Sequence, residues 1–296
     1  MKKKEQVQEP KIQEVSEIEA VPVEEQNVIF KPNVGPQTEF LAAGEREVLY
    51  GGSAGGGKSY AMLADPLRYM GHPSFSGLLL RHTTEELREL IFKSKEMYPQ
   101  IWKGIKWSER KMQWEAPSGA RLWMSYLDRD DDVLRYQGLA FSWIGFDELT
   151  QWSTPYAWNY MRSRLRSTAH DLPVYMRATT NPGGPGHQWV KKMFIDPAPY
   201  GKQFDATDIE SGNVLTYPKG HSKQGQALFK RRFIPARLSD NPYLAEQGDY
   251  EAMLLSLPEH QRKQLLEGDW DIKEGAAFSE FDRNIHVVEP FSIPRN

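Results

Sequence analysis

A glycine-rich loop near residue 55 carries the clearest chemistry in this sequence. Residues 52–59 are Gly-Ser-Ala-Gly-Gly-Gly-Lys-Ser, a full match to the pattern G-x-x-x-x-G-K-[ST]. Glycines at these positions let successive backbone N–H groups converge on phosphate oxygens. In this pattern Lys58 reaches the β- and γ-phosphates, and the Ser59 hydroxyl is a ligand of Mg²⁺. The pattern predicts an ATP-binding loop made of Gly52, Ser53, Ala54, Gly55, Gly56, Gly57, Lys58 and Ser59.

Two acids follow the apolar run Phe141–Phe146 about ninety residues after the loop. An apolar strand that ends in acids places carboxylates at the carboxyl edge of a sheet, where α/β folds bind ligands. We expect Asp147 to hold Mg²⁺ through water and Glu148 to orient the attacking water as general base. Many strands end in acids, so this motif alone is weak evidence for a metal site. The phosphate loop upstream makes that interpretation stronger.

The polar run Thr179-Thr180-Asn181 follows a further apolar segment and precedes Pro-Gly-Gly. Polar side chains at a strand end can hydrogen-bond the γ-phosphate or the lytic water and report hydrolysis to the next segment. Asn-Pro-Gly is equally an ordinary turn composition. The residues alone leave a coupling role and a plain turn evenly balanced.

Arg81 ends the short apolar run Gly77–Leu80 and should lie at the same sheet edge. A guanidinium there could neutralise charge that develops on the γ-phosphate, in its own subunit or in a neighbour. A salt-bridged arginine is the alternative, and from the sequence alone it is slightly favoured. The rival candidates, which lie on a predicted helix, are Arg162, Arg164 and Arg166.

Two further polar features have open interpretations. Gln37 precedes the first predicted strand, and its amide could pair with the adenine edge, although a surface glutamine in a loop is the simpler interpretation. The segment 191–237 carries nine lysines and arginines with interleaved aromatic residues. It could face DNA, face another subunit, or be a solvated surface. The net charge of −3 requires any DNA contact to come from a local patch or from several subunits together.

The elements that must position these residues alternate between strand-like and helix-like patterns. Strands are predicted at 47–50, 77–81, 141–146 and 173–179, and helices at 60–70, 84–97 and 154–165. The turn Pro117-Ser118-Gly119 between two strand-like runs predicts a β-hairpin. This alternation predicts an α/β fold with a mainly parallel central sheet.

Composition divides the chain into four parts. Residues 1–28 lack aromatic residues and have the composition of a disordered tail. We expect the α/β core over 29–236, a small helical subdomain over 237–275 and a linker over 276–296. The chain contains no cysteine, which excludes disulfides and thiolate metal sites. No apolar run is long enough to span a bilayer, and no signal peptide opens the chain.

Taken together, these residues resemble the large subunit of tailed-phage terminases, from about Gly35 to Val288. The phosphate loop alone is generic, and the ordered set of motifs is specific. The strings that carry the resemblance are GPQTEFL, VLYGGSAGGGKS, LLLRHTTEELREL, YQGLAFSWIGFDELTQW, SRLR, ATTNPGG, DNPYL and LLEGDWD.

The resemblance implies a P-loop NTPase of the ASCE type, with residues 237–275 as its lid subdomain. It implies that Gln37 contacts adenine, that Thr179, Thr180 and Asn181 form the coupling motif, and that Arg81 is a candidate finger acting between subunits. ATP and Mg²⁺ are the implied cofactors. The implied partners are double-stranded DNA, the portal protein, the small terminase subunit and further copies in a ring on the portal, in the host cell cytoplasm and without a membrane.

The function expected is ATP hydrolysis that drives double-stranded DNA into a viral procapsid. The family continues into a nuclease domain with clustered acids, and no acidic cluster follows Asp282, so we expect no nuclease activity from this chain. A helicase or other nucleic-acid translocase, and a nucleotide-gated assembly protein, are the alternatives. No second motor core is evident in 296 residues, which weighs against a helicase, and Glu148 weighs against a pure binding protein.

Overall fold

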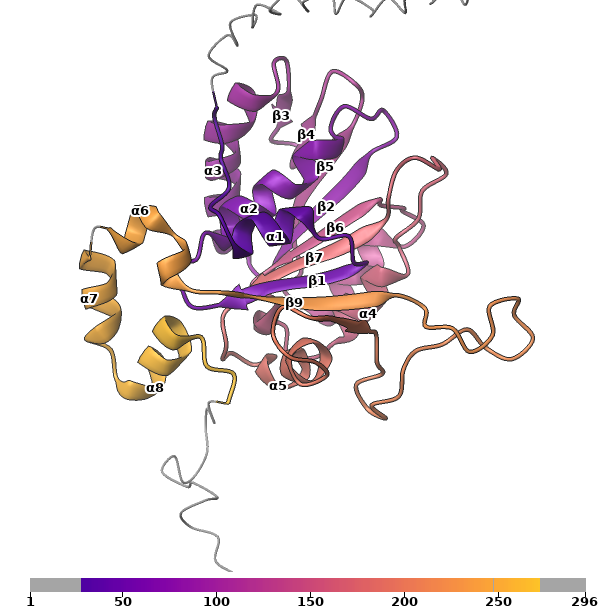
Figure 1. Cartoon of the computed structure of the whole chain (residues 1–296). Coiled ribbons are helices and arrows are strands. Elements are labelled where there is room, and N and C mark those ends of the chain that lie inside the picture. Colours follow the sequence, from indigo (N-terminus) through magenta and orange to yellow (C-terminus); the bar gives the residue numbers. More distant parts are fainter. Residues whose placement is uncertain (1–27, 247, 272–296) are drawn as a thin grey trace, which may run out of the picture.

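The computed structural model describes residues 28–246 and 248–271. Almost all of the predicted tail and the whole of the predicted linker lie outside these residues. In the described part, nine strands form one sheet in the order β3-β4-β5-β2-β6-β7-β1-β9-β8 (Figure 1). The strands are β1 (Glu47–Gly52), β2 (Ser76–Arg81), β3 (Lys106–Ser108), β4 (Gln113–Glu115), β5 (Arg121–Tyr126), β6 (Trp143–Asp147), β7 (Tyr175–Thr180), β8 (Gln203–Asp205) and β9 (Lys230–Ala236).

The six central strands, from β5 to β9 in sheet order, are mutually parallel. Antiparallel strands close both edges: β3 and β4 on one side and β8 on the other. Strands β1, β6 and β7 are buried along their whole length, as expected for parallel strands covered on both faces. The predictions of a mainly parallel sheet and of a hairpin around Pro117-Ser118-Gly119 are confirmed, because β4 and β5 pair across that turn.

Helices cover both faces of the sheet (Figure 1). One apolar cluster joins the sheet to α2 and α3, and another joins the opposite face to α4 and α5. The helices are α1 (Pro36–Ala42), α2 (Lys58–Ala64), α3 (Thr84–Ile101), α4 (Tyr156–Arg162), α5 (His187–Val190), α6 (Pro242–Ala245), α7 (Asp249–Leu255) and α8 (Glu259–Arg262). Within the described part, no helix is long and apolar enough to cross a membrane.

Local sequence explains where the helices on the first face begin and end. Thr83 accepts a hydrogen bond from the Glu86 backbone, and the Glu86 carboxylate accepts one from the Thr83 N–H, so a capping box starts α3. The helix predicted over 60–70 is α2 followed by a 3₁₀ turn, η1 (Asp65–Tyr69). Pro66 lies at the start of η1, and its missing N–H ends the α-helical hydrogen-bonding pattern there.

Two of the elements that were not predicted from the sequence bear on the residues discussed above. Helix α1 contains Gln37, for which a loop was the simpler interpretation. Strand β9 lies between β1 and β8, inside the segment interpreted as a basic surface. That interpretation is wrong for Arg231, which is buried and forms an ion pair with the buried carboxylate of Glu47 at 2.7 Å. The cation is therefore part of the core and not of a surface.

A small helical region follows β9. It comprises η5 (Leu238–Asp240), α6, α7, α8 and the π-helical turn η6 (Lys263–Glu267), which confirms the helical character predicted after residue 237. We call residues 238–271 the lid. Its last segment returns to the sheet, where Trp270 is buried against Phe233 of β9.

Candidate nucleotide site

The predicted site residues meet at the carboxyl ends of three adjacent parallel strands. Strand β7 lies between β6 and β1, with Asp147 and Tyr50 both paired in register with Thr179. The glycine-rich loop leaves the end of β1, Asp147 ends β6, and Thr179 and Thr180 end β7. Residues far apart in the sequence are thus brought to one edge of the sheet.

The loop from Gly52 to Gly57 has a conformation that its glycines make possible. Gly52, Gly55 and Gly57 have positive φ values of 137°, 77° and 76°. A Cβ atom at Gly52 would lie 2.3 Å from the carbonyl oxygen of Ala236, so a side chain there would push the loop away from β9. Gly57 caps α2, which begins at Lys58, so the last amides of the loop lie at a helix N-terminus.

Lys58 points back into the loop. Its Nζ donates to the Ser53 carbonyl and to Oδ1 of Asn181, both at 2.8 Å. Burial lowers the pKa of Lys58, while the nearby carboxylates of Glu148 and Asp147 act in the opposite direction. The ammonium group is therefore held at the junction of the loop, the paired acids and the predicted coupling motif.

Asp147 has two different partners at its two carboxylate oxygens. The Thr179 hydroxyl donates to Oδ1. Arg81 forms an ion pair with Oδ2, with 2.9 Å between Nε and the oxygen. Neither of these two atoms has a hydrogen-bond partner among the described residues, because the Nε–H is not aimed at the carboxylate. Oδ2 therefore keeps lone pairs available for a further ligand.

Glu148 occupies a strained position directly after β6. Its φ and ψ are 60° and 58°, in the left-handed region that non-glycine residues rarely adopt. Asn181 donates to its carboxylate from the backbone N–H at 3.3 Å and from the side-chain amide at 3.4 Å. Loss of hydration raises the pKa of Glu148, and the Asp147 charge raises it further against the opposing effect of Lys58. A carboxyl group with a raised pKa is suited to accept a proton near neutral pH.

The three residues of the predicted coupling motif each contact different partners. Thr179 binds Asp147, Asn181 bridges Lys58 and Glu148, and the Thr180 hydroxyl lies 2.7 Å from that of Thr150. All three lie at the site and none belongs to a solvent-exposed turn. The plain-turn alternative does not account for these contacts.

Gln37 lies against the outside of the loop. It is buried on α1, and its side-chain nitrogen donates to the Gly57 carbonyl at 2.8 Å. Its side-chain oxygen accepts from the Asn33 backbone at 2.6 Å. Gln37 is not the exposed loop residue of the simpler interpretation, and its contact with adenine stays a prediction.

The rival arginines lie far from this edge. Arg162 pairs with Glu47 at the start of β1, at the opposite end of the strand from the loop. Arg164 and Arg166 flank Leu165, which pairs with Phe141 just before β6. Only Arg81 of these candidates lies beside Asp147, and it is buried and ion-paired within its own chain.

Several contacts to the loop were not found from the sequence. The Tyr50 hydroxyl donates to the Gly56 carbonyl at 2.7 Å, and the Asn241 amide donates to the Gly55 carbonyl at 2.6 Å. The backbone N–H of Ala54 donates to the Leu265 carbonyl in the lid at 2.6 Å. Asn241 lies in the string DNPYL, which carries part of the family resemblance but does not by itself indicate a contact to the loop. Main-chain contacts such as that of Leu265 leave no side-chain signature.

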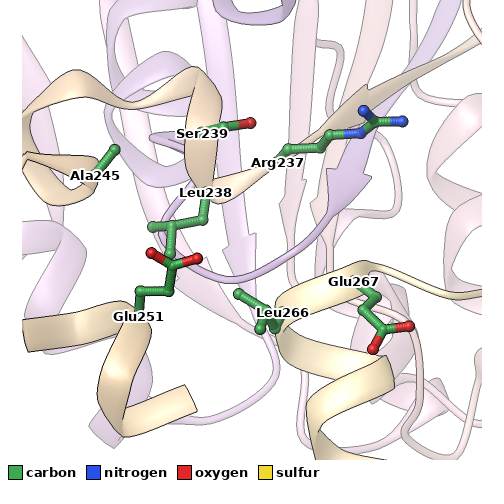
Figure 2. Close-up of a pocket in the computed structure, with 7 residues that line it drawn as sticks. All are labelled: Arg237, Leu238, Ser239, Ala245, Glu251, Leu266 and Glu267. Atoms are coloured by element: carbon green, nitrogen blue, oxygen red, sulfur yellow. The ribbon is translucent and has the colours of Figure 1, made fainter. Parts of the chain in front are cut away.

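The lid packs directly on the loop. Leu238, Leu244 and Tyr250 lie against Gly55, and Gly268 lies against Gly52 and Ser53. A cavity of about 330 Å³ opens within the lid, next to these contacts. Figure 2 shows the Glu251 carboxylate pointing toward the Leu238 side chain and the Arg237 guanidinium directed away from it. The cavity is lined by Arg237, Leu238, Ser239, Ala245, Glu251, Leu266 and Glu267.

Residues 49–285 match the family model for the N-terminal part of the terminase large subunit of the T4-like virus type. The chain belongs to this terminase family. A search of the curated proteins found no match. Among solved structures, the chain resembles the large terminase of a thermophilic bacteriophage in complex with ADP, with 18% identity and a TM-score of 0.58 over 89% of this chain and 60% of that one.

The chain also resembles the large terminase ATPase domain of Thermus phage P74-26. Here the identity is 13% and the TM-score 0.50, over 81% of this chain and 94% of that domain. These similarities confirm the predicted fold class, an α/β fold with a mainly parallel central sheet. The terminase chain spans 60% of the length of the ADP-bound bacteriophage protein that it matches.

Proposed function

We propose that this terminase chain hydrolyses ATP and that hydrolysis drives double-stranded DNA into a viral procapsid. The observation that carries the proposal is the hydrogen-bonded network in which Asn181 links Lys58 to Glu148 beside Asp147. A protein that only bound a nucleotide would need the loop and the lysine, but it would not need a strained, half-buried carboxylate next to them. The large terminase of the thermophilic bacteriophage was solved in complex with ADP, which supports nucleotide binding by this chain.

Each residue of the network has a proposed role in hydrolysis. Backbone amides of residues 55–59 and the Lys58 ammonium bind the phosphates. Glu148 orients a water molecule in line with the γ-phosphate and accepts its proton, a task that its raised pKa favours. Asn181 positions both groups and, together with Thr179 and Thr180, links the state of the phosphate to the next segment. Gln37 supports the loop through Gly57 and contributes to adenine recognition.

The donors at this edge fit Mg²⁺. Asp147 offers Oδ2, which has no hydrogen-bond partner among the described residues, and Ser59 offers a hydroxyl at the start of α2. Within the described part no group of three acidic or histidine side chains could hold a metal ion. That suits Mg²⁺, which in nucleotide sites keeps several water ligands and takes others from the phosphates. When bound, Mg²⁺ would neutralise charge on the β- and γ-phosphates.

The proposed partners are double-stranded DNA, the portal protein, the small terminase subunit and further copies of the chain in a ring on the portal. Membership of the terminase family supports these partners. Because the net charge is −3, a single subunit is not a general polyanion binder, so DNA is engaged by a local surface or by several subunits together.

The direct test is steady-state ATP hydrolysis by Lys58→Ala. We expect turnover to be abolished, because Lys58 is the only lysine of the loop and its ammonium group is buried at the network. Lys103→Ala, which removes an exposed lysine beside β3, is the matched control and should retain turnover. Undiminished hydrolysis by pure Lys58→Ala would exclude the proposed site.

The same assay separates the remaining alternatives. Stimulation of turnover by double-stranded DNA on a portal-bearing procapsid, with protection of the DNA from nuclease, would establish packaging. Stimulation by single-stranded nucleic acid would favour a helicase. ATP binding without turnover in any assembly would favour a nucleotide-gated assembly protein.

A further inference from the structure

A projecting arm connects β8 to β9. Residues 206–229 leave the sheet at its β8 edge and extend away from it, on the opposite side of the molecule from the lid (Figure 1). The arm ends where β9 begins, and the start of β9 pairs with the start of β1. The arm therefore lies at the amino ends of these parallel strands, whereas the nucleotide site lies at their carboxyl ends. It contributes no residue to the network described above.

The arm is held together mainly by its own backbone. Leu215 donates to the Ala206 carbonyl and Leu228 donates to the Leu215 carbonyl, both at 2.8 Å. Further out, Tyr217 donates to the Gln226 carbonyl at 3.0 Å and Gly225 donates back to Tyr217 at 3.1 Å. All nine residues from 218 to 226 are exposed. The turn is therefore accessible to a molecule outside the subunit.

The charges along the arm are sharply divided. The acids Asp208 and Glu210 lie near its base, and no aspartate or glutamate occurs between residues 211 and 229. The tip carries Lys219, His221 and Lys223, and neither lysine forms an ion pair with any described residue. In contrast, the three basic residues at the start of β9 are all neutralised. They are Lys230 with Asp205, Arg231 with Glu47 and Arg232 with Glu39.

The side chains of the tip are partly fixed. The ring of Tyr217 stacks on that of His221 with centroids 4.5 Å apart and planes 17° apart. Lys223 lies over the Tyr217 ring at 5.8 Å. The Gly220 N–H donates to the Gln224 side chain at 2.9 Å. A pre-ordered basic turn loses less conformational entropy on binding than a free loop does.

We propose that the arm tip, residues 217–226, binds the phosphate backbone of double-stranded DNA. This inference rests on the proposed function, in which double-stranded DNA is a partner of the chain. Uncompensated lysines, backbone amides and small polar residues are the groups that proteins direct at phosphates. The tip lacks exposed large apolar residues, which would anchor a protein partner.

The position of the arm connects the proposed DNA contact to the nucleotide site through strand β9. Strand β9 begins at the arm and ends at Ala236, whose carbonyl accepts a hydrogen bond from the Ser53 N–H of the phosphate loop at 2.8 Å. The lid starts directly after β9. One strand therefore joins the DNA-binding tip to both the phosphate loop and the lid.

The test compares two double variants of the full chain. Lys219→Ala with Lys223→Ala removes the two tip cations. Lys103→Ala with Lys106→Ala removes two exposed lysines beside β3, at the far end of the sheet. Binding to a labelled double-stranded DNA fragment of random sequence is measured by fluorescence anisotropy between about 50 and 200 mM salt. Thermal melting checks that each variant is folded.

We expect the tip variant to bind about tenfold more weakly at low salt. The slope of log affinity against log salt should fall by about 2, since each lost phosphate contact removes about one unit. The control pair should bind like the unmodified chain.

Equal binding and equal slopes for both variants, or no binding by the unmodified chain, would overturn the assignment to DNA. Loss of self-association by the tip variant with unchanged DNA binding would also overturn it and would assign the tip to a neighbouring subunit. ATP hydrolysis without DNA is measured separately, so its absence contradicts the proposed function without deciding the role of the arm.

Discussion

Glu148 shows how a single residue is adapted to its proposed task. The left-handed backbone turns the chain sharply after β6, and Asn181 then fixes the carboxylate with two hydrogen bonds. A strained non-glycine residue persists only where its surroundings over-determine it, and such residues cluster at functional sites. The strain, the raised pKa and the link to Lys58 all occur at the residue proposed as general base.

Glu148→Gln is expected to keep ATP binding and to lower kcat by about 10² or more, because the amide keeps the size of the side chain and can accept one of the two hydrogen bonds from Asn181, but it cannot accept a proton. The pH profile provides a second measurement. The pKa of Glu148 is raised above 4.5, so the rate of the unmodified chain should fall with decreasing pH through a value above 4.5, as the base becomes protonated. The residual rate of the variant should lack this inflection. A variant with normal turnover would require a base elsewhere.

Arg81 is ion-paired in the structure, which agrees with the alternative that the sequence alone slightly favours and differs from the family resemblance. Family resemblance implies a finger that reaches a neighbour, whereas the structure pairs Arg81 with its own Asp147. The ion pair favours action within one subunit. Arg81→Ala should therefore bind ATP within a few-fold of normal and lose about 10³ in kcat even when assembled.

A mixture of assembled Arg81→Ala and Glu148→Gln subunits decides between the two modes of action. If Arg81 acts in its own subunit, no active site in the mixture contains both groups, and the mixture should stay inactive. Recovery of hydrolysis in demonstrably mixed assemblies would assign the arginine to the neighbouring site.

Among the elements, β1 depends on a buried ion pair at its start. Glu47 is fully buried between Arg231 of β9 and Arg162 of α4. Burial alone would raise the pKa of Glu47, but the two arginines outweigh it and hold the pKa below 4.5. The pair therefore contributes stability above pH 4.5 that is lost as the pH falls through the lowered value.

Glu47→Gln should reduce the free energy of unfolding by about 3–5 kcal/mol, because it leaves the Arg231 guanidinium buried without a counter-charge. Arg162→Ala, which removes the more exposed partner and leaves the Glu47–Arg231 pair, should cost less. Urea denaturation at pH 7 and near pH 4 measures both effects, and the difference between Glu47→Gln and the unmodified chain should narrow at the lower pH. If the difference in the free energy of unfolding between Glu47→Gln and the unmodified chain did not change with pH, the carboxylate charge would not have this role.

Four of the central strands could be predicted from the sequence, and β9 could not. The runs that form β2 and β6 are apolar, and those that form β1 and β7 each carry one buried charge, Glu47 and Arg177. All four end in glycine or polar groups, so both their strand character and the site at their ends were recognisable. Strand β9 was not, because it opens with three consecutive basic residues, and Arg231 among them is neutralised by its distant partner Glu47. The lid contacts of Ala54 and Gly268 were equally hidden, since they depend on main-chain atoms and on tertiary packing.

At the scale of the whole molecule, the phosphate loop lies between the sheet and the lid. The lid contacts it through the Leu265 carbonyl and through Gly268, while Asn241 holds Gly55. On the opposite side, the arm leaves the start of β9 (Figure 1). The proposed nucleotide site and the proposed DNA contact thus lie at opposite ends of β9. Because the lid contacts the phosphate loop directly, a change in the loop can reach the lid without passing through the arm.

Gly268 offers the sharpest test of the lid. Its φ is 66°, and a Cβ atom there would lie 2.8 Å from the Ser53 nitrogen and 3.0 Å from Gly52. Gly248, also in the lid, has a φ of 70° and open space around the same position. Alanine at either residue should cost about 1–2 kcal/mol of backbone strain, but only Gly268→Ala forces the lid away from the loop.

We therefore expect Gly268→Ala to lower kcat/KM for ATP by about tenfold or more, because small displacements of a positioned site cost that much in rate. Gly248→Ala should lower the melting temperature by a similar amount and leave ATP hydrolysis almost unchanged. Steady-state kinetics and thermal melting of the two variants separate displacement of the lid from simple loss of stability. Equal kcat/KM values in the two variants would mean that the lid contacts the loop without influencing ATP hydrolysis. The path of contacts from β9 through the loop to the lid would then have no role in catalysis.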